Sequence, residues 1–206
     1  FKVALEEWQK LLTTHMQQLE KRQSPVLNWS EPGLAIEDAI GWMQKSGDAS
    51  ASTVLERMSA ILTKMLSSGQ NLHHPHYIGH QVPASVPLAG LFDAVSSITN
   101  QVMAIYEMGP WATAVEHAVV KALCQKVGWH DGCGTGLLTH GGSLANLTAL
   151  LTARNVSLPG SWENGVPENT VLITHADAHY CVTRSAGILG LGSRQVVKAK
   201  LDSNGR

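Results

Sequence analysis

The residues best suited to binding a ligand form the segment Thr139-His140-Gly141-Gly142-Ser143. Adjacent glycines let a ligand approach the backbone, and the apolar periodicity that follows predicts a helix from residue 143. The N–H groups at a helix start lack acceptors within the helix, so together with the Ser143 hydroxyl they favour an anion such as phosphate. An ordinary strand-to-helix turn capped by Ser143 explains the same residues, and the segment alone does not separate the two interpretations. It matches neither the P-loop nor the GxGxxG pattern.

A second polar segment, Thr174-His175-Ala176-Asp177-Ala178-His179-Tyr180, follows a short apolar run. In open α/β sheets the carboxyl ends of the strands face the ligand crevice, so this segment and the glycine turn are expected at one pocket. His179 is the candidate ligand-contacting residue there. Read alone, a histidine at such a position is more often a partly exposed structural residue than a ligand.

The region between residues 67 and 87 is rich in histidine and proline, which predicts a long loop. Its histidines are His73, His74, His76 and His80. Zinc sites usually combine a tight pair of ligands on one element with further His, Cys or carboxylate ligands, but Pro75 prevents a helical pair and no HExxH pattern is present. We therefore expect no metal site, and the lack of a GxSxG elbow argues against a serine nucleophile.

Two kinds of element must position these residues. Three-to-four spacing of apolar residues predicts helices over residues 3–19, 34–45, 53–67, 88–106 and 111–127. After Gly128 the pattern alternates, with strands expected at 136–139, 171–174 and 194–200 and helices at 143–155 and 180–189. Such alternation is typical of a mainly parallel sheet with flanking helices, so the fold class is α/β, preceded by a helical segment.

Composition excludes several classes of function. The 206 residues include 15 Lys and Arg against 16 Asp and Glu, a net charge of −1 that argues against a nucleic-acid partner. No apolar run is long enough to cross a membrane. The three cysteines form no CxxC pair, which favours a reducing compartment, and we expect the cytoplasm.

Taken together, these segments resemble the group II pyridoxal-phosphate-dependent amino-acid decarboxylases, the glutamate, aromatic amino-acid and diaminobutyrate enzymes. The matching blocks are His74-Pro75-His76-Tyr77-Ile78-Gly79-His80-Gln81, Thr139-His140-Gly141-Gly142-Ser143-Leu144-Ala145-Asn146-Leu147, and Ala178-His179-Tyr180-Cys181 with residues 186–192. Met108-Gly109-Pro110 also resembles a block of that family. The combination of blocks, in this order, is more specific than any one of them.

The resemblance implies a fold and a site. Residues 1–87 would form the N-terminal helical segment and substrate-entrance loop, and residues 88–206 the first part of a fold-type I pyridoxal-phosphate-dependent transferase large domain. Gly142 and Ser143 would hold the phosphate of pyridoxal 5′-phosphate (PLP), and His179 would stack on its ring as the catalytic residue. His80 and Tyr77 would contact the amino-acid substrate, with His80 near its carboxylate.

The implied activity is decarboxylation of an L-amino acid by a homodimer. The family's Schiff-base lysine and the aspartate that pairs with the pyridine nitrogen are expected beyond residue 206, so we expect a fragment whose remainder is a C-terminal continuation or a separate chain. The alternatives are another fold-type I PLP enzyme, an aminotransferase or lyase, and a non-catalytic binding or dimerisation fragment. A metal hydrolase ranks well behind these interpretations.

Overall fold

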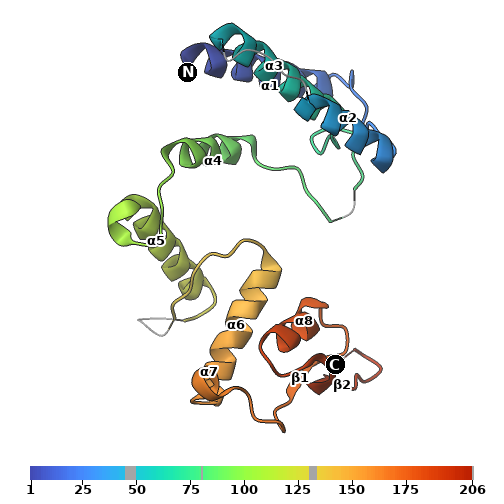
Figure 1. The fold of residues 1–206 in the computed structure, drawn as a ribbon. Helices are drawn as coiled ribbons and strands as arrows, with labels where there is room; N and C mark the ends of the chain where they lie inside the picture. Colours follow the sequence, from blue (N-terminus) through green and yellow to red (C-terminus); the bar gives the residue numbers. More distant parts are fainter. Residues whose placement is uncertain (45–49, 80, 130–133, 206) are drawn as a thin grey trace. The chain divides into compact units, whose positions relative to one another are not determined.

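The computed structural model describes residues 1–44, 50–79, 81–129 and 134–205 (Figure 1). The chain divides into two units, Phe1–Asn100, which is helical, and Gln101–Arg206, which contains helices and a sheet. The predicted class, a helical segment followed by α/β structure, is confirmed. The domain boundary predicted between residues 87 and 88 stays a prediction.

The first unit is built on two long helices that pack side by side, α1 (Lys2–Glu20) and α3 (Ala51–Ser68) (Figure 1). Each has an apolar stripe along one face that packing covers in part, and Leu19 of α1 is only 2% exposed. Ser50 precedes α3, and its hydroxyl accepts a hydrogen bond from the Thr53 N–H at 3.3 Å, which caps the helix. Helix α2 (Pro32–Gln44) lies between them in sequence, and its Asp38 forms an ion pair with Lys64 of α3 at 2.6 Å.

Asn71 ties the start of the histidine-rich loop to the turn after α1. Its N–H donates to the Val26 carbonyl at 2.8 Å, and its side-chain Nδ2 donates to the Pro25 carbonyl at 2.6 Å. Leu27 and Gln70 form an antiparallel bridge beside it. With 6% exposure, Asn71 is a buried polar residue whose hydrogen bonds offset the cost of its burial.

Helix α4 (Pro87–Thr99) is shorter than predicted, because the expected helix over 88–106 ends at Asn100. Asn100 adopts the left-handed conformation, with φ 47° and ψ 50°, and its N–H bonds to the Ser96 carbonyl. Asparagine tolerates this conformation better than most residues and often ends helices in this way. The chain resumes a helical path only in the short 3-10 helix η1 (Tyr106–Met108).

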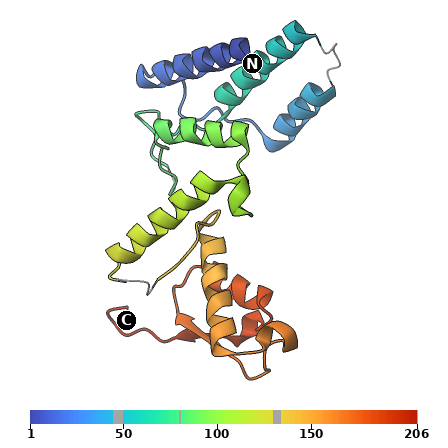
Figure 2. The same cartoon turned by 90° about the vertical axis from the view of Figure 1, so that its left-hand side faces the viewer.

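The second unit combines helices with a two-stranded sheet (Figure 2). Strands β1 (Leu172–His175) and β2 (Val196–Ala199) are parallel, as predicted, with Leu172 opposite Val196. The remaining elements are α5 (Pro110–Lys126), α6 (Gly142–Ser157), α7 (Ser161–Asn164), α8 (Cys181–Ile188) and the 3-10 helix η2 (Ser193–Gln195). Helix α8 joins the two strands and packs against α6, where it buries Cys181, Ser185 and Ala186.

The strand expected at residues 136–139 is absent from the part of the chain that the structure describes. In a sheet, the Leu138 N–H would donate to a carbonyl of a neighbouring strand. Here it donates to the Glu116 carboxylate of α5 at 2.8 Å. A side chain has therefore replaced a sheet partner in satisfying this backbone donor. The last predicted strand, 194–200, is also shorter, because η2 occupies its first residues.

Among the described helices, none combines the length and the apolar character needed to cross a membrane.

Candidate functional site

The glycine turn leads directly into α6. Gly141 has φ 87° and ψ 157°, a conformation essentially restricted to glycine. The turn is held by the Gly141 N–H, which donates to the Thr139 carbonyl at 3.0 Å, and the first bond of the helix runs from the Ala145 N–H to the Gly141 carbonyl at 3.3 Å. Because Gly141 occupies the capping position, the alternative in which Ser143 caps the helix is wrong.

The start of α6 is suited to an anion. Gly142, Ser143 and Leu144 are its first three residues, so their N–H groups have no acceptor within the helix. Gly141 cannot cap them, because it has no side chain. A Cβ atom built on Gly141 or Gly142 would meet nothing within 4 Å, so the space beside the turn is open. Backbone donors, a nearby exposed hydroxyl and the positive end of the helix dipole all fit a phosphate group.

His179 lies just before α8 with an exposed side chain. Its Nδ1 accepts a hydrogen bond from the Cys181 N–H at 3.3 Å, so the neutral ring carries its proton on Nε2. The adjacent Tyr180 ring lies 4.1 Å from it, tilted by 38°, and the Arg184 guanidinium lies 4.7 Å from the Tyr180 ring centroid. His179 is thus a ring with its orientation held at Nδ1, and it could stack on a flat ligand.

One hydrogen bond connects the two predicted parts of this site. Asn146, one turn into α6, donates from Nδ2 to Cys181 Sγ at 3.1 Å, and Cys181 in turn holds His179. The structure therefore brings the helix start with Gly142 and Ser143 to the same end of the α6–α8 pair as His179. Sequence reasoning missed Asn146 as the residue that links the two parts of the site, because its contact with Cys181 has no signature in the local spacing.

His175 makes a similar local contact but has a different role. Its Nδ1 accepts from the Asp177 N–H at 3.1 Å, and its Nε2 lies 3.2 Å from the Gly205 carbonyl. Both ring nitrogens are therefore engaged by the backbone, so His175 ties the end of β1 to residues near the end of the second unit.

The predicted substrate-binding residues belong to the first unit. His80 lies outside the described residues. Tyr77 is half-buried, and its hydroxyl donates to the Val82 carbonyl at 3.2 Å. His74, 6% exposed, anchors the loop by accepting at Nδ1 from the His76 N–H at 3.1 Å. A Cβ atom on Gly79 would meet the outer end of the Tyr77 ring, so a larger residue there would displace that ring.

The described residues contain no group of three or more His, Cys, Asp or Glu side chains arranged to hold a metal ion. Two of the loop's histidines contact each other, with the His74 and His76 rings 5.4 Å apart in an edge-to-face arrangement.

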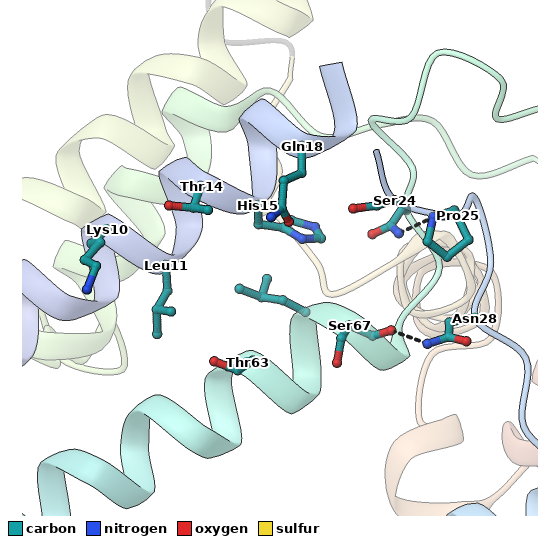
Figure 3. Close-up of a pocket in the computed structure, with 12 residues that line it drawn as sticks. Lys10, Leu11, Thr14, His15, Gln18, Ser24, Pro25, Asn28, Thr63 and Ser67 are labelled. Carbon is teal, nitrogen blue, oxygen red and sulfur yellow. Dashed lines mark hydrogen bonds between the residues drawn. The ribbon is translucent and has the colours of Figure 1, made fainter. Parts of the chain in front are cut away.

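A cavity of about 360 Å³ lies between α1 and α3 (Figure 3). His15 and Gln18 of α1 face Ser67 of α3 across it, and Asn28 Nδ2 donates to the Ser67 carbonyl at 2.8 Å. Burial lowers the pKa of His15 below its usual 6.5, and the nearby His73 acts in the same direction, whereas a hydrogen bond with Asn71 opposes both. None of the sequence-predicted site residues lines this cavity.

The lowered pKa predicts that acid weakens the first unit. Unfolded His15 binds a proton as the pH falls through about 6.5, before folded His15 does, so α1 should lose stability as the pH falls below that value. His15→Gln keeps a polar side chain that does not titrate and should reduce this loss. Hydrogen exchange of the α1 amides at several pH values, corrected for intrinsic exchange, would measure it. His117→Gln, at an exposed position on α5, is the control, and equal pH dependence in His15→Gln and wild type would contradict the prediction.

Comparison with known proteins identifies the family. The pyridoxal-dependent decarboxylase conserved domain matches residues 26–205. The chain is similar to an L-2,4-diaminobutyrate decarboxylase from Acinetobacter baumannii, with 26% identity over 208 residues, 85% of this chain and 41% of that protein. It is also similar to the crystal structure of mouse CSAD, with a TM-score of 0.80 and 25% identity over 100% of this chain and 43% of that one.

A more distant likeness supports the fold alone. The structure of tryptophan decarboxylase from Catharanthus roseus, in complex with L-tryptophan, has a TM-score of 0.77 at 18% identity and covers 99% of this chain and 42% of that one. The fold is thus one that PLP-dependent decarboxylases share. The chain belongs to the pyridoxal-dependent decarboxylase family, whose cofactor is the one expected from the sequence. It spans about two fifths of the length of these relatives, 41% to 43%.

Proposed function

We propose that this chain supplies the cofactor phosphate site and the ring-stacking histidine of a PLP-dependent L-amino-acid decarboxylase. The chain belongs to a PLP-dependent family, and one observation in it carries the proposal. The Asn146–Cys181 hydrogen bond links the start of α6, which is suited to an anion, to His179. Neither feature alone would distinguish a cofactor site from an ordinary turn. Together, a helix start suited to phosphate and a flat ring at the same end of one helix pair support a site for a phosphorylated pyridine.

Each residue has a defined role in this proposal. The N–H groups of Gly142 and Ser143, with the Ser143 hydroxyl, would bind the phosphate and fix one end of the cofactor. His179 would stack on the ring and keep it oriented, while its Nδ1 accepts from the Cys181 N–H. When bound, PLP supplies the conjugated ring that takes up the electron pair released as carbon dioxide leaves. This chain's residues bind and orient it.

The remaining assignments of the proposal concern substrate and assembly. Residues 88–206 would begin the cofactor-binding domain, and residues 1–87 would form the helical segment and entrance loop, with Tyr77 and His80 contacting the amino acid. The diaminobutyrate decarboxylase of Acinetobacter baumannii suggests a small polar amino acid as substrate. We propose a cytoplasmic homodimer, and the free, buried Cys124 and Cys181 are consistent with a reducing compartment.

The activity can be tested on the full-length protein that carries this chain. Carboxyl-labelled L-2,4-diaminobutyrate, L-glutamate and L-tryptophan would be supplied separately with PLP, and labelled carbon dioxide would be collected. Release of label that requires PLP supports the proposal. Keto-acid formation without release of label would instead identify an aminotransferase, and PLP binding without turnover of any of these substrates would favour a non-catalytic protein.

The phosphate assignment makes a separate prediction for Ser143. Ser143→Ala removes one hydroxyl donor to a charged group, so PLP affinity should fall about tenfold while the backbone donors remain. Fluorescence titration of the cofactor-free full-length protein would measure the dissociation constant. Ser157→Ala, at the other end of α6, is the matched control and should bind like wild type. Unchanged affinity in Ser143→Ala would remove this hydroxyl from the phosphate site.

A further inference from the structure

Cys181 occupies a position between the two halves of the site. It is the first residue of α8 and is only 2% exposed. Its Sγ accepts from Asn146 Nδ2 at 3.1 Å, and its backbone N–H donates to His179 Nδ1 at 3.3 Å. One residue therefore contacts α6 through its side chain and His179 through its backbone.

These contacts restrict His179 in two ways. A donor at Nδ1 fixes the tautomer of the neutral ring and one of its in-plane directions. The position of that donor depends on where Cys181 sits, and the Asn146 amide holds Cys181 against α6. The other neighbour of the ring, Tyr180, is 60% exposed and is not anchored to α6 by any of the contacts described for it.

We infer that Asn146 and Cys181 form a positioning pair, which holds the His179 ring at a fixed distance and angle from the anion-binding start of α6. A phosphate binds at one point, but a phosphorylated ring must satisfy the helix start and His179 at once. The pair would therefore affect binding of the whole cofactor and leave binding of phosphate alone unaffected. This inference rests on the proposed function, because it takes PLP as the ligand.

A second link between the same helices provides a control. Arg154, near the end of α6, donates from Nη1 to the Leu189 carbonyl just after α8 at 3.0 Å. This contact lies at the opposite end of α6 from Gly142 and Ser143. If Asn146 served only to hold the helices together, removing Arg154 should have the same effect on ligand binding.

The experiment uses the cofactor-free full-length protein and two probes, inorganic phosphate and 4′-deoxypyridoxine 5′-phosphate, which has the phosphate and ring of PLP but lacks the aldehyde. Dissociation constants would be measured by calorimetry for wild type and five variants. These variants are Asn146→Ala, Cys181→Ala, the double variant of both, Cys181→Ser and Arg154→Met. Thermal unfolding would be recorded in parallel to follow stability.

We expect Asn146→Ala and Cys181→Ala each to lower the affinity for the ring-containing probe about threefold to tenfold, the range expected for one neutral hydrogen bond. Phosphate affinity should stay within about twofold of wild type. The double variant should lose no more affinity for this probe than either single variant, because both substitutions remove the same bond. Cys181→Ser keeps an acceptor and should bind the probe like wild type. Arg154→Met should lower the unfolding temperature without lowering the affinity for the probe.

Other results would overturn the inference. Equal losses for both probes, additive losses in the double variant, or a loss in Arg154→Met that matches Asn146→Ala would make the pair structural only. Wild-type binding of the ring probe by Asn146→Ala would overturn the inference while leaving the proposed function intact. A wild-type protein that binds neither probe would overturn both.

Discussion

Replacing His179 by alanine is expected to lower the rate of carbon dioxide release about 100-fold, the scale of loss when a reacting group is no longer held in position. The His179 side chain is exposed, so its removal opens no cavity in the core. Stability should therefore change little, and the unfolding temperature should stay close to that of wild type. Steady-state rates of the full-length protein, measured beside its thermal unfolding, would separate the two effects.

His175 provides a matched control for this experiment. Both histidines lie in the same segment, and both accept a backbone N–H at Nδ1 from the residue two positions later, at 3.1 Å for His175 and 3.3 Å for His179. His175→Ala should thus lose the same kind of local bond with a much smaller effect on rate. His179→Phe, which keeps a flat ring, should retain part of the activity. Equal rates in His175→Ala and His179→Ala would show that the loss comes from the segment's backbone and would exclude stacking by His179.

Replacing Gly141 by alanine is expected to weaken PLP binding roughly 10-fold to 100-fold. At φ 87° and ψ 157° an alanine is strained by about 1–3 kcal/mol, and the chain can relieve that strain only by changing the turn. Such a change would redirect the N–H groups of Gly142 and Ser143, which form the proposed phosphate site. The dissociation constant for PLP, measured on the cofactor-free full-length protein, would report the change.

Gly192 allows the general cost of strain to be separated from a local effect on the site. Its φ of 88° and ψ of 141° are close to those of Gly141, but it lies after α8, just before η2. Gly192→Ala should therefore lower stability by a similar amount and leave PLP affinity nearly unchanged. If Gly141→Ala bound PLP as tightly as wild type, the glycine turn would not be the phosphate site.

Local features of the fold followed from the sequence wherever a short stretch of chain was enough to define them. Apolar periodicity predicted the long helices α1 and α3 within two residues of their observed ends. The strand predicted at 136–139 was wrong, because strand formation depends on a neighbour, and here the Leu138 N–H bonds to the Glu116 side chain. The end of α4 was also missed, because one left-handed residue, Asn100, ends a helix that apolar periodicity alone would have continued.

In the candidate site too, the sequence predicted what depends on a short stretch of chain and missed what depends on distant residues. Glycines 141 and 142, Ser143 and His179 could be singled out because their residue types and their places before helices have local physical meaning, and the order of the blocks indicated the family that comparison confirmed. Their roles in binding the cofactor stay predictions. His80 and Tyr77 were chosen by resemblance alone, and they stay predictions as well.

The sequence by itself determined the helical and α/β character of the chain and its family, and it singled out candidate residues for binding a phosphorylated ring, because all of these depend on composition, periodicity and local motifs. Only the tertiary structure decided that Asn146 donates to Cys181, a residue 35 positions away, and that Cys181 in turn holds Nδ1 of His179. A hydrogen bond of this kind depends on the packing of α6 against α8. That packing results from burying side chains of both helices together, and no local pattern in either helix specifies it.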